Sequence, residues 1–166
     1  KKFNKINYKR VQSLKSTRQH FNEKKNLSAI EIKEFSFLYI ILNKPELVKK
    51  NYNLIKNVKL FSNENKLLFE EILSQSNNLE ETNLEILKID QNLIDRILKY
   101  ASIKHILSKN LNDDEKILEI LSEVIRDLKN YELELRISDL ESKFSKDLSE
   151  ATFNELKELK KQQKIN

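Results

Sequence analysis

The chain has 166 residues, of which 39% are hydrophobic and 34% are charged, so it can bury a core beneath a well-solvated surface. Its net charge of +5 is concentrated in the first 27 residues, because the remainder is slightly acidic. The absence of cysteine excludes disulfides, thiolate metal sites and thiol nucleophiles, and the absence of glycine excludes glycine-rich phosphate-binding loops.

The composition predicts an all-α fold. With no glycine, a single proline and abundant Leu, Lys, Glu and Ile, the chain favours helices throughout. The densest apolar run, residues 35–42, is eight residues long, well short of the roughly 18 to 20 that cross a bilayer. No secretory signal follows the basic start. We therefore expect a cytoplasmic protein without membrane contact and, because methionine is absent, a part of a longer protein.

Residues 1–27 form a basic leader with nine Lys or Arg and one acid, Glu23. Such an asymmetry is typical of an arm that binds nucleic acid, and it also fits a solvated linker. The few apolar residues of the leader define only a weak helical stripe. We therefore expect a linker or tether, with a weak nucleic-acid contact as the alternative.

The first predicted helix begins at a capping box. In Ser28-Ala-Ile-Glu31 the serine oxygen and the glutamate each accept an N–H that the first helical turn leaves unpaired. The helix runs through Leu42 and ends at Lys44, because the residue before a proline disfavours the α region. Apolar residues on nearly all sides predict a central, buried helix. Pro45 then suits the first turn of the next helix.

Four further helices are expected before the longest one. One covers about residues 46–57, a second is capped by Ser62, a third opens with the capping box Thr82-Asn-Leu-Glu85, and a fourth is capped by Asp90. The apolar residues expected to face inward from them are Leu47, Val48, Leu54, Ile55, Leu67, Leu68, Ile72, Leu73, Ile86, Leu87, Leu93, Ile94, Ile97, Leu98 and Ile103.

The longest predicted helix begins at Asn112 and lacks any helix-breaking residue until about Leu148. It carries two apolar stripes. The first consists of Ile117, Leu121, Val124, Leu128, Tyr131 and Leu135. The second consists of Leu133, Ile137, Leu140, Phe144 and Leu148. At about 100° per residue the stripes lie on opposite faces, so one packed neighbour cannot cover both.

The helix expected from Ser149 is the simplest partner for the second stripe if it folds back as a hairpin. The sequence thus predicts a basic linker (1–27), a small helical bundle (28–130), and a long helix that leads into a C-terminal two-helix hairpin (131–166). At the tip of the hairpin, Phe144, Leu148 and Phe153 either hold the turn together or contact a partner.

No catalytic constellation is visible. The two histidines, His20 and His105, lack the spacing of a metal site, and Asp113, Asp114 and Glu115 fit the acidic first turn of a helix. The serines have no evident base and orienting group. We expect no catalysis, no cofactor and no small-molecule substrate for this chain.

Two segments carry a resemblance to a known family. An apolar helix followed by Asn43-Lys-Pro45-Glu-Leu47, and the segment from Leu60 to Ile72 with its aromatic residue before a helix, resemble the start of the C-terminal domain of bacterial DNA primase of the DnaG type. The order of short helices, one long helix and a closing helix is also similar. The resemblance covers residues 28–166.

The resemblance implies a binding module that docks on the N-terminal domains of the hexameric replicative helicase of the DnaB type at the replication fork. It implies recruitment of primase, modulation of priming and unwinding, and main contacts through the hairpin. Zinc and magnesium, with the nucleotidyltransferase activity of a primase, would belong to parts upstream, and residues 1–27 would be the tether. The implied partner-binding positions are Leu140, Phe144, Leu148, Phe153, Leu156, Lys157, Leu159 and Lys160.

Three other interpretations remain open. The chain could be the N-terminal domain of the helicase itself, which this resemblance cannot separate by fold. It could be a helical adaptor that binds nucleic acid through its leader, in which case affinity would fall steeply with salt. It could also be an unrelated helical scaffold or a self-associating coiled coil, which would sediment as a stable dimer.

Overall fold

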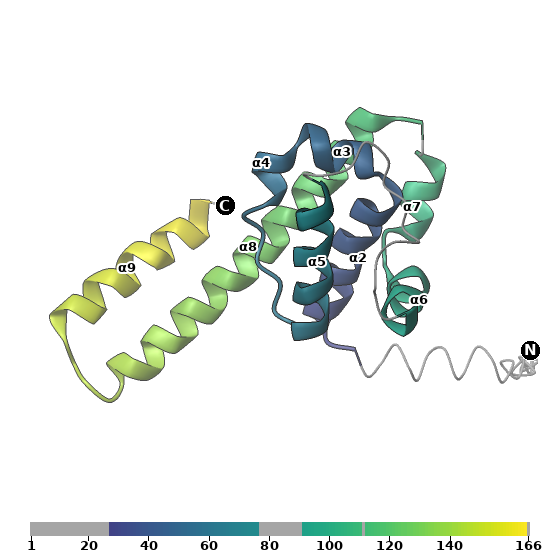
Figure 1. The fold of residues 1–166 in the computed structure, drawn as a ribbon. Coiled ribbons are helices and arrows are strands. Elements are labelled where there is room, and N and C mark those ends of the chain that lie inside the picture. Colours follow the sequence, from purple (N-terminus) through teal and green to yellow (C-terminus); the bar gives the residue numbers. More distant parts are fainter. Residues whose placement is uncertain (1–26, 77–90, 111, 166) are drawn as a thin grey trace, which may run out of the picture.

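The computed structural model describes residues 27–76, 91–110 and 112–165 (Figure 1). Helices and no strands occur in these ranges, which confirms the all-α prediction. The helices are α2 (Ala29–Asn43), α3 (Pro45–Lys50), α4 (Tyr52–Ile55), α5 (Asn63–Ser76), α6 (Gln91–Tyr100), α7 (Lys104–Lys109), α8 (Asp114–Phe144) and α9 (Glu150–Ile165). None of them combines the length and hydrophobicity that a bilayer-spanning segment needs.

The helices form a bundle from which a two-helix arm projects. Helix α2 and the first half of α8 pack against each other, and α3, α5, α6 and α7 also contact α2. Helix α8 continues beyond the bundle, and α9 folds back antiparallel to its second half (Figure 1). The arm touches the rest of the molecule mainly through α8, which belongs to both parts.

Helix α2 is the central helix, as the sequence predicts. Its capping box is formed, because Ser28 Oγ accepts the N–H of Glu31 (3.2 Å) and Glu31 Oε2 accepts the N–H of Ser28 (2.9 Å). Its large side chains are buried on several sides, since Phe37 and Leu38 are both fully covered. The helix ends at Asn43, directly before Lys44 and the proline.

Two predicted helices are interrupted. The segment expected as one helix over 46–57 is divided into α3 and α4 at Asn51, whose side-chain Nδ2 and backbone N–H both donate to Leu47 O. An asparagine that bonds back to the preceding turn competes with helix propagation, which explains the break. The helix expected to reach Ile103 ends at Tyr100, and a new helix, α7, starts at Lys104.

The ends of the long helix differ slightly from the prediction. Asp113 is the N-cap, and its side chain accepts the N–H of Lys116 at 2.9 Å. The helix ends at Phe144, so Leu148 lies in the connection to α9. The predicted capping box Thr82–Glu85 and the predicted cap Asp90 lie outside the described residues.

Several residues expected to face inward are exposed instead. They are Leu54, Leu67 and Leu98, with exposed fractions of 37%, 67% and 38%. In α5 the core is reached by Leu68 and Phe69, and Leu67 lies about 100° away from Leu68 on the outer edge. Periodicity identifies an apolar face, but it does not show how far the neighbouring helices cover the edges of that face.

The two stripes of α8 enter two separate cores, as predicted from their opposite faces. The first core includes Ile117 and extends along α8 to Leu128. The second consists of buried residues of α8 and α9, namely Ile137, Leu140, Leu156 and Leu159, with Leu133 packed against them. Leu135 was expected to be buried with the first stripe, but it is 44% exposed because it lies beyond the end of the bundle.

Candidate docking surface on the helical hairpin

The hairpin is held together by a short apolar seam between α8 and α9. Ile137, Leu140, Leu156 and Leu159 form this seam, and each is only 7–9% exposed. The connection is compact, because the N–H groups of Lys146 and Asp147 both donate to Lys143 O at 3.0 Å. A seam of four buried residues is small for a free-standing unit, and most of the other described residues of α9 are exposed.

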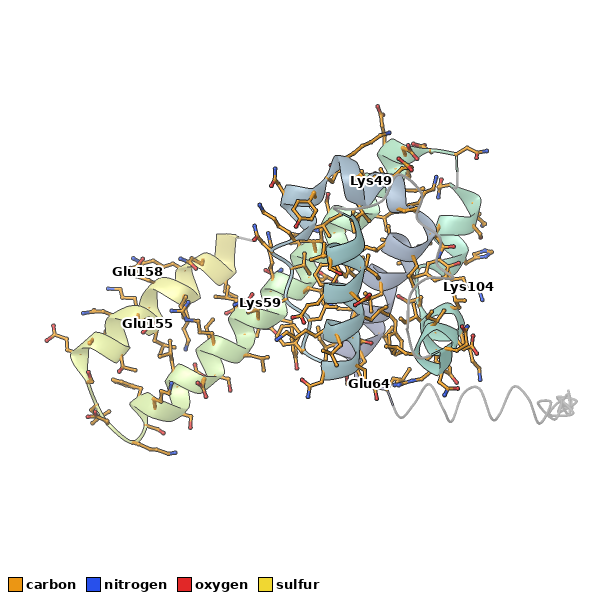
Figure 2. The ribbon with its side chains drawn as sticks, in the orientation of Figure 1. Lys49, Lys59, Glu64, Lys104, Glu155 and Glu158 are labelled. Carbon is orange, nitrogen blue, oxygen red and sulfur yellow. The ribbon has the colours of Figure 1, made fainter. Side chains whose placement is uncertain are left out.

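Ion pairs link the two helices on either side of the seam. Arg136 Nη2 lies 2.5 Å from Glu155 Oε1, and Lys160 Nζ lies 2.6 Å from Glu141 Oε1. At about 100° per residue, Glu155 and Lys160 flank the seam from opposite edges. Figure 2 shows Glu155 and Glu158 along α9. Exposed pairs of this kind contribute roughly 0.2–1 kcal/mol each, so the seam supplies most of the stability.

Apolar side chains gather at the tip of the hairpin. The rings of Phe144 and Phe153 lie 5.8 Å apart with an interplanar angle of 39°, so they contact each other across the start of the turn. Phe153 is nevertheless 49% exposed, and Leu148 is 80% exposed. The two phenylalanines therefore help to close the turn, whereas Leu148 contributes little to it.

A shallow groove follows one face of α9. It is lined by Phe153, Leu156, Lys157, Lys160 and Lys161, with a predominantly apolar surface. These residues recur at helical spacings of three and four, so they share one side of the helix. The groove thus has an apolar floor and a basic rim.

Lys161 is a groove residue outside the predicted partner-binding set, although its position four residues after Lys157 indicates the same face. Its Nζ lies 2.7 Å from Glu158 Oε1, and the hydrogen bond from this ammonium lowers the pKa of Glu158. Both side chains are more than half exposed, so the pair can open to meet another charged group at little cost.

The predicted partner-binding residues fall into two sets. Leu140 and Leu159 lie in the seam, where they hold the hairpin together and present almost no surface. The remaining residues lie together at the tip and along the groove: Phe144, Leu148, Phe153, Leu156, Lys157 and Lys160. Leu156 belongs to both sets, because it is buried in the seam and also lines the groove floor.

The described residues contain no group of three or more His, Asp or Glu side chains placed to hold a metal ion. His105 is exposed on α7, far along the chain from the hairpin.

The segment that carries the resemblance to primase forms the junction of α2 and α3. Asn43 is the last residue of α2, Pro45 is the first of α3, and Leu47 is buried in the bundle core. Comparison of the chain with models of protein families, with curated proteins and with solved structures found no match.

Proposed function

We propose that this chain is a protein-docking domain of a bacterial DNA primase of the DnaG type, and that it binds the N-terminal domain of a DnaB-type replicative helicase through its hairpin. The observation that carries the proposal is the exposed apolar tip beside the basic groove. Leu148 is 80% exposed and Phe153 is 49% exposed on an arm that stands apart from the bundle. In this role the domain recruits its parent enzyme and performs no catalysis itself.

The hairpin supports docking better than the bundle does. Its two helices bury one seam and leave the flank with Phe153 and Leu156 as an apolar groove. A third helix laid into such a groove would complete a three-helix unit, which is a common way for helical surfaces to recognise each other. An arm that projects from its bundle also reaches a partner without steric hindrance from that bundle.

The chemistry of the groove defines the partner surface. Lys157, Lys160 and Lys161 line its rim, so a complementary helix carries apolar residues toward the floor and acidic residues at its edges. Exposed charges at a rim contribute to the association rate and to specificity more than to affinity. A small apolar contact of this kind gives weak, rapidly exchanging binding, which suits repeated recruitment to a moving fork.

The test compares two exposed leucines in a titration with the N-terminal domain of the cognate helicase. Leu148→Ser removes the apolar tip, and we expect the dissociation constant to rise about tenfold, equivalent to roughly 1.4 kcal/mol. Leu67→Ser is the matched control, because Leu67 is 67% exposed on α5, away from the hairpin. Calorimetry or NMR titration provides the measurement.

Two outcomes would contradict the proposal. One is the absence of a complex between the parent chain and the helicase domain. The other is an equal loss of affinity in both variants, which would place the contact elsewhere. Added salt should weaken the parent complex moderately, because the rim lysines are exposed.

A deletion variant tested against both DNA and the helicase domain separates the nucleic-acid alternative. This alternative depends on residues 1–27, whose nine basic residues stand against one acid. Deletion of this leader should abolish binding to DNA if phosphate contacts carry it, whereas helicase docking through the hairpin should survive the deletion. Loss of helicase binding on deletion would contradict docking through the hairpin.

A further inference from the structure

Between its two cores, helix α8 crosses a stretch without buried side chains, in which Leu133 packs partly against the second core. Leu128 is its last side chain in the first core, and Ile137 is its first buried side chain in the second. None of the residues 129–136 between them is buried. A short stretch of solvated helix has little stability of its own, so the direction of the arm depends on whatever supports this stretch.

Support comes from the loop that connects α4 to α5. The ring of Phe61 meets the ring of Tyr131 edge to face, with centroids 5.0 Å apart and an interplanar angle of 83°. Lys59 Nζ lies 2.5 Å from Glu132 Oε1. Figure 2 shows Lys59 beside α8, where this helix leaves the bundle. We call these four residues the brace.

The brace is anchored in the bundle by a buried carboxylate. Glu34 of α2 is fully buried, and its Oε1 accepts the backbone N–H groups of Phe61 and of Ser62, the latter at 3.2 Å. Its Oε2 accepts from Asn65 Nδ2 at 2.7 Å. The carboxylate therefore fixes the end of the loop and the start of α5 to the central helix.

Each of these contacts is costly to lose. Glu34 is fully buried, and a buried acceptor that loses its donors costs about 1–3 kcal/mol, or more when it is charged, so the loop cannot leave Glu34 without a large penalty. The position of the Phe61 backbone in turn sets the position of its ring against Tyr131. A continuous path of contacts thus runs from α2 through the loop to the root of the arm.

We propose that the brace fixes the direction of the hairpin relative to the bundle, with Glu34 as its anchor. The significance of the brace for docking rests on the proposed function. A fixed arm presents its tip to a partner at one angle to the bundle, and it transmits a force on the hairpin to α2. The fixed direction of the hairpin is a property of the isolated chain and needs no partner.

The experiment measures a distance between the bundle and the arm. The chain has no native cysteine, so Ser108→Cys on α7 and Ser142→Cys on α8 provide two unique positions for spin labels. Both serines are exposed. Pulsed electron-electron double resonance on the full chain should give one narrow distance distribution.

Tyr131→Ala removes the ring contact, and we expect the distribution to broaden about twofold because the solvated stretch of α8 is then unsupported. Tyr131→Phe is the matched control, since it keeps the ring and should keep the narrow distribution. Glu34→Gln should broaden it as well, through a loosened loop. Circular dichroism of each variant establishes that the helices remain.

An unchanged narrow distribution in a folded Tyr131→Ala chain would overturn the proposal, and so would equal broadening in Tyr131→Phe. If Glu34→Gln does not fold, the two variants at Tyr131 still decide the question. Failure of the hairpin to bind a helicase would refute the proposed function and would leave the distance result intact.

Discussion

The carboxylate of Glu31 closes the capping box at the start of α2. It accepts the backbone N–H of Ser28, and this hydrogen bond lowers the pKa of Glu31. A group whose pKa is lower in the folded state contributes stability above its unfolded pKa and loses that contribution as the pH falls through the folded value. The contribution of Glu31 is therefore present at neutral pH and disappears in acid.

We expect Glu31→Gln to reduce the acid sensitivity of the chain. Glutamine retains an acceptor for the N–H of Ser28 but does not titrate, so the variant should lose less unfolding free energy than the parent between neutral pH and about pH 3. Glu134→Gln, at an exposed position in the middle of α8, is the control. Urea unfolding at a series of pH values measures the difference, and equal acid sensitivity of parent and Glu31→Gln would contradict it.

Glu34 shows the limit of sequence analysis at this scale. It lies within an apolar helix, three residues from the capping residue Glu31, and nothing in the local pattern marks it as buried. Its acceptor role depends on Phe61 and Ser62, which are brought to it only by the tertiary fold. By contrast, the capping box could be predicted, because both of its partners lie within one helical turn.

The change of apolar face along α8 was the most informative element in the sequence. Helical geometry converts the spacing of Ile117, Leu128, Ile137 and Leu140 directly into two faces, so two cores followed from arithmetic. The division of α3 from α4 was not predicted, because Asn51 is compatible with a helix and breaks it only through its own side-chain hydrogen bond. Of the site, the tip and groove were largely predictable, whereas the brace was not.

Leu140 tests the independence of the hairpin seam. We expect Leu140→Ala to destabilise the hairpin by about 2–4 kcal/mol, because it removes a buried side chain from a seam of four. Hydrogen exchange should then accelerate in α9 and in the end of α8, while α2 stays protected. Leu135→Ala is the matched control, since Leu135 is 44% exposed on the same helix. Similar exchange in both variants would contradict the role of the seam.

At the scale of the whole molecule, the bundle and the hairpin each have a core and share helix α8, and within the described residues the loop between α4 and α5 also contacts α8 where it leaves the bundle. The sequence predicted this plan because the bundle and the hairpin each have their own stripe on α8. It could not predict the angle between them, which depends on the contacts of Phe61 and Lys59 with α8. The two-part fold thus follows from the apolar stripes on α8, whereas the angle between bundle and hairpin follows from tertiary contacts.

Because α8 is continuous, each residue inserted between the two cores rotates the hairpin by a fixed angle around the helix axis. One alanine inserted between Glu132 and Leu133 should turn the hairpin by about 100° around the helix axis and advance it by about 1.5 Å, with both cores intact. Seven alanines should bring it back to within about 20° of its original heading, roughly 10 Å farther out. Spin-label distances between the bundle and the hairpin should change by these rotations and translations. Recognition by a partner of fixed shape should be lost with one inserted residue and return in part with seven.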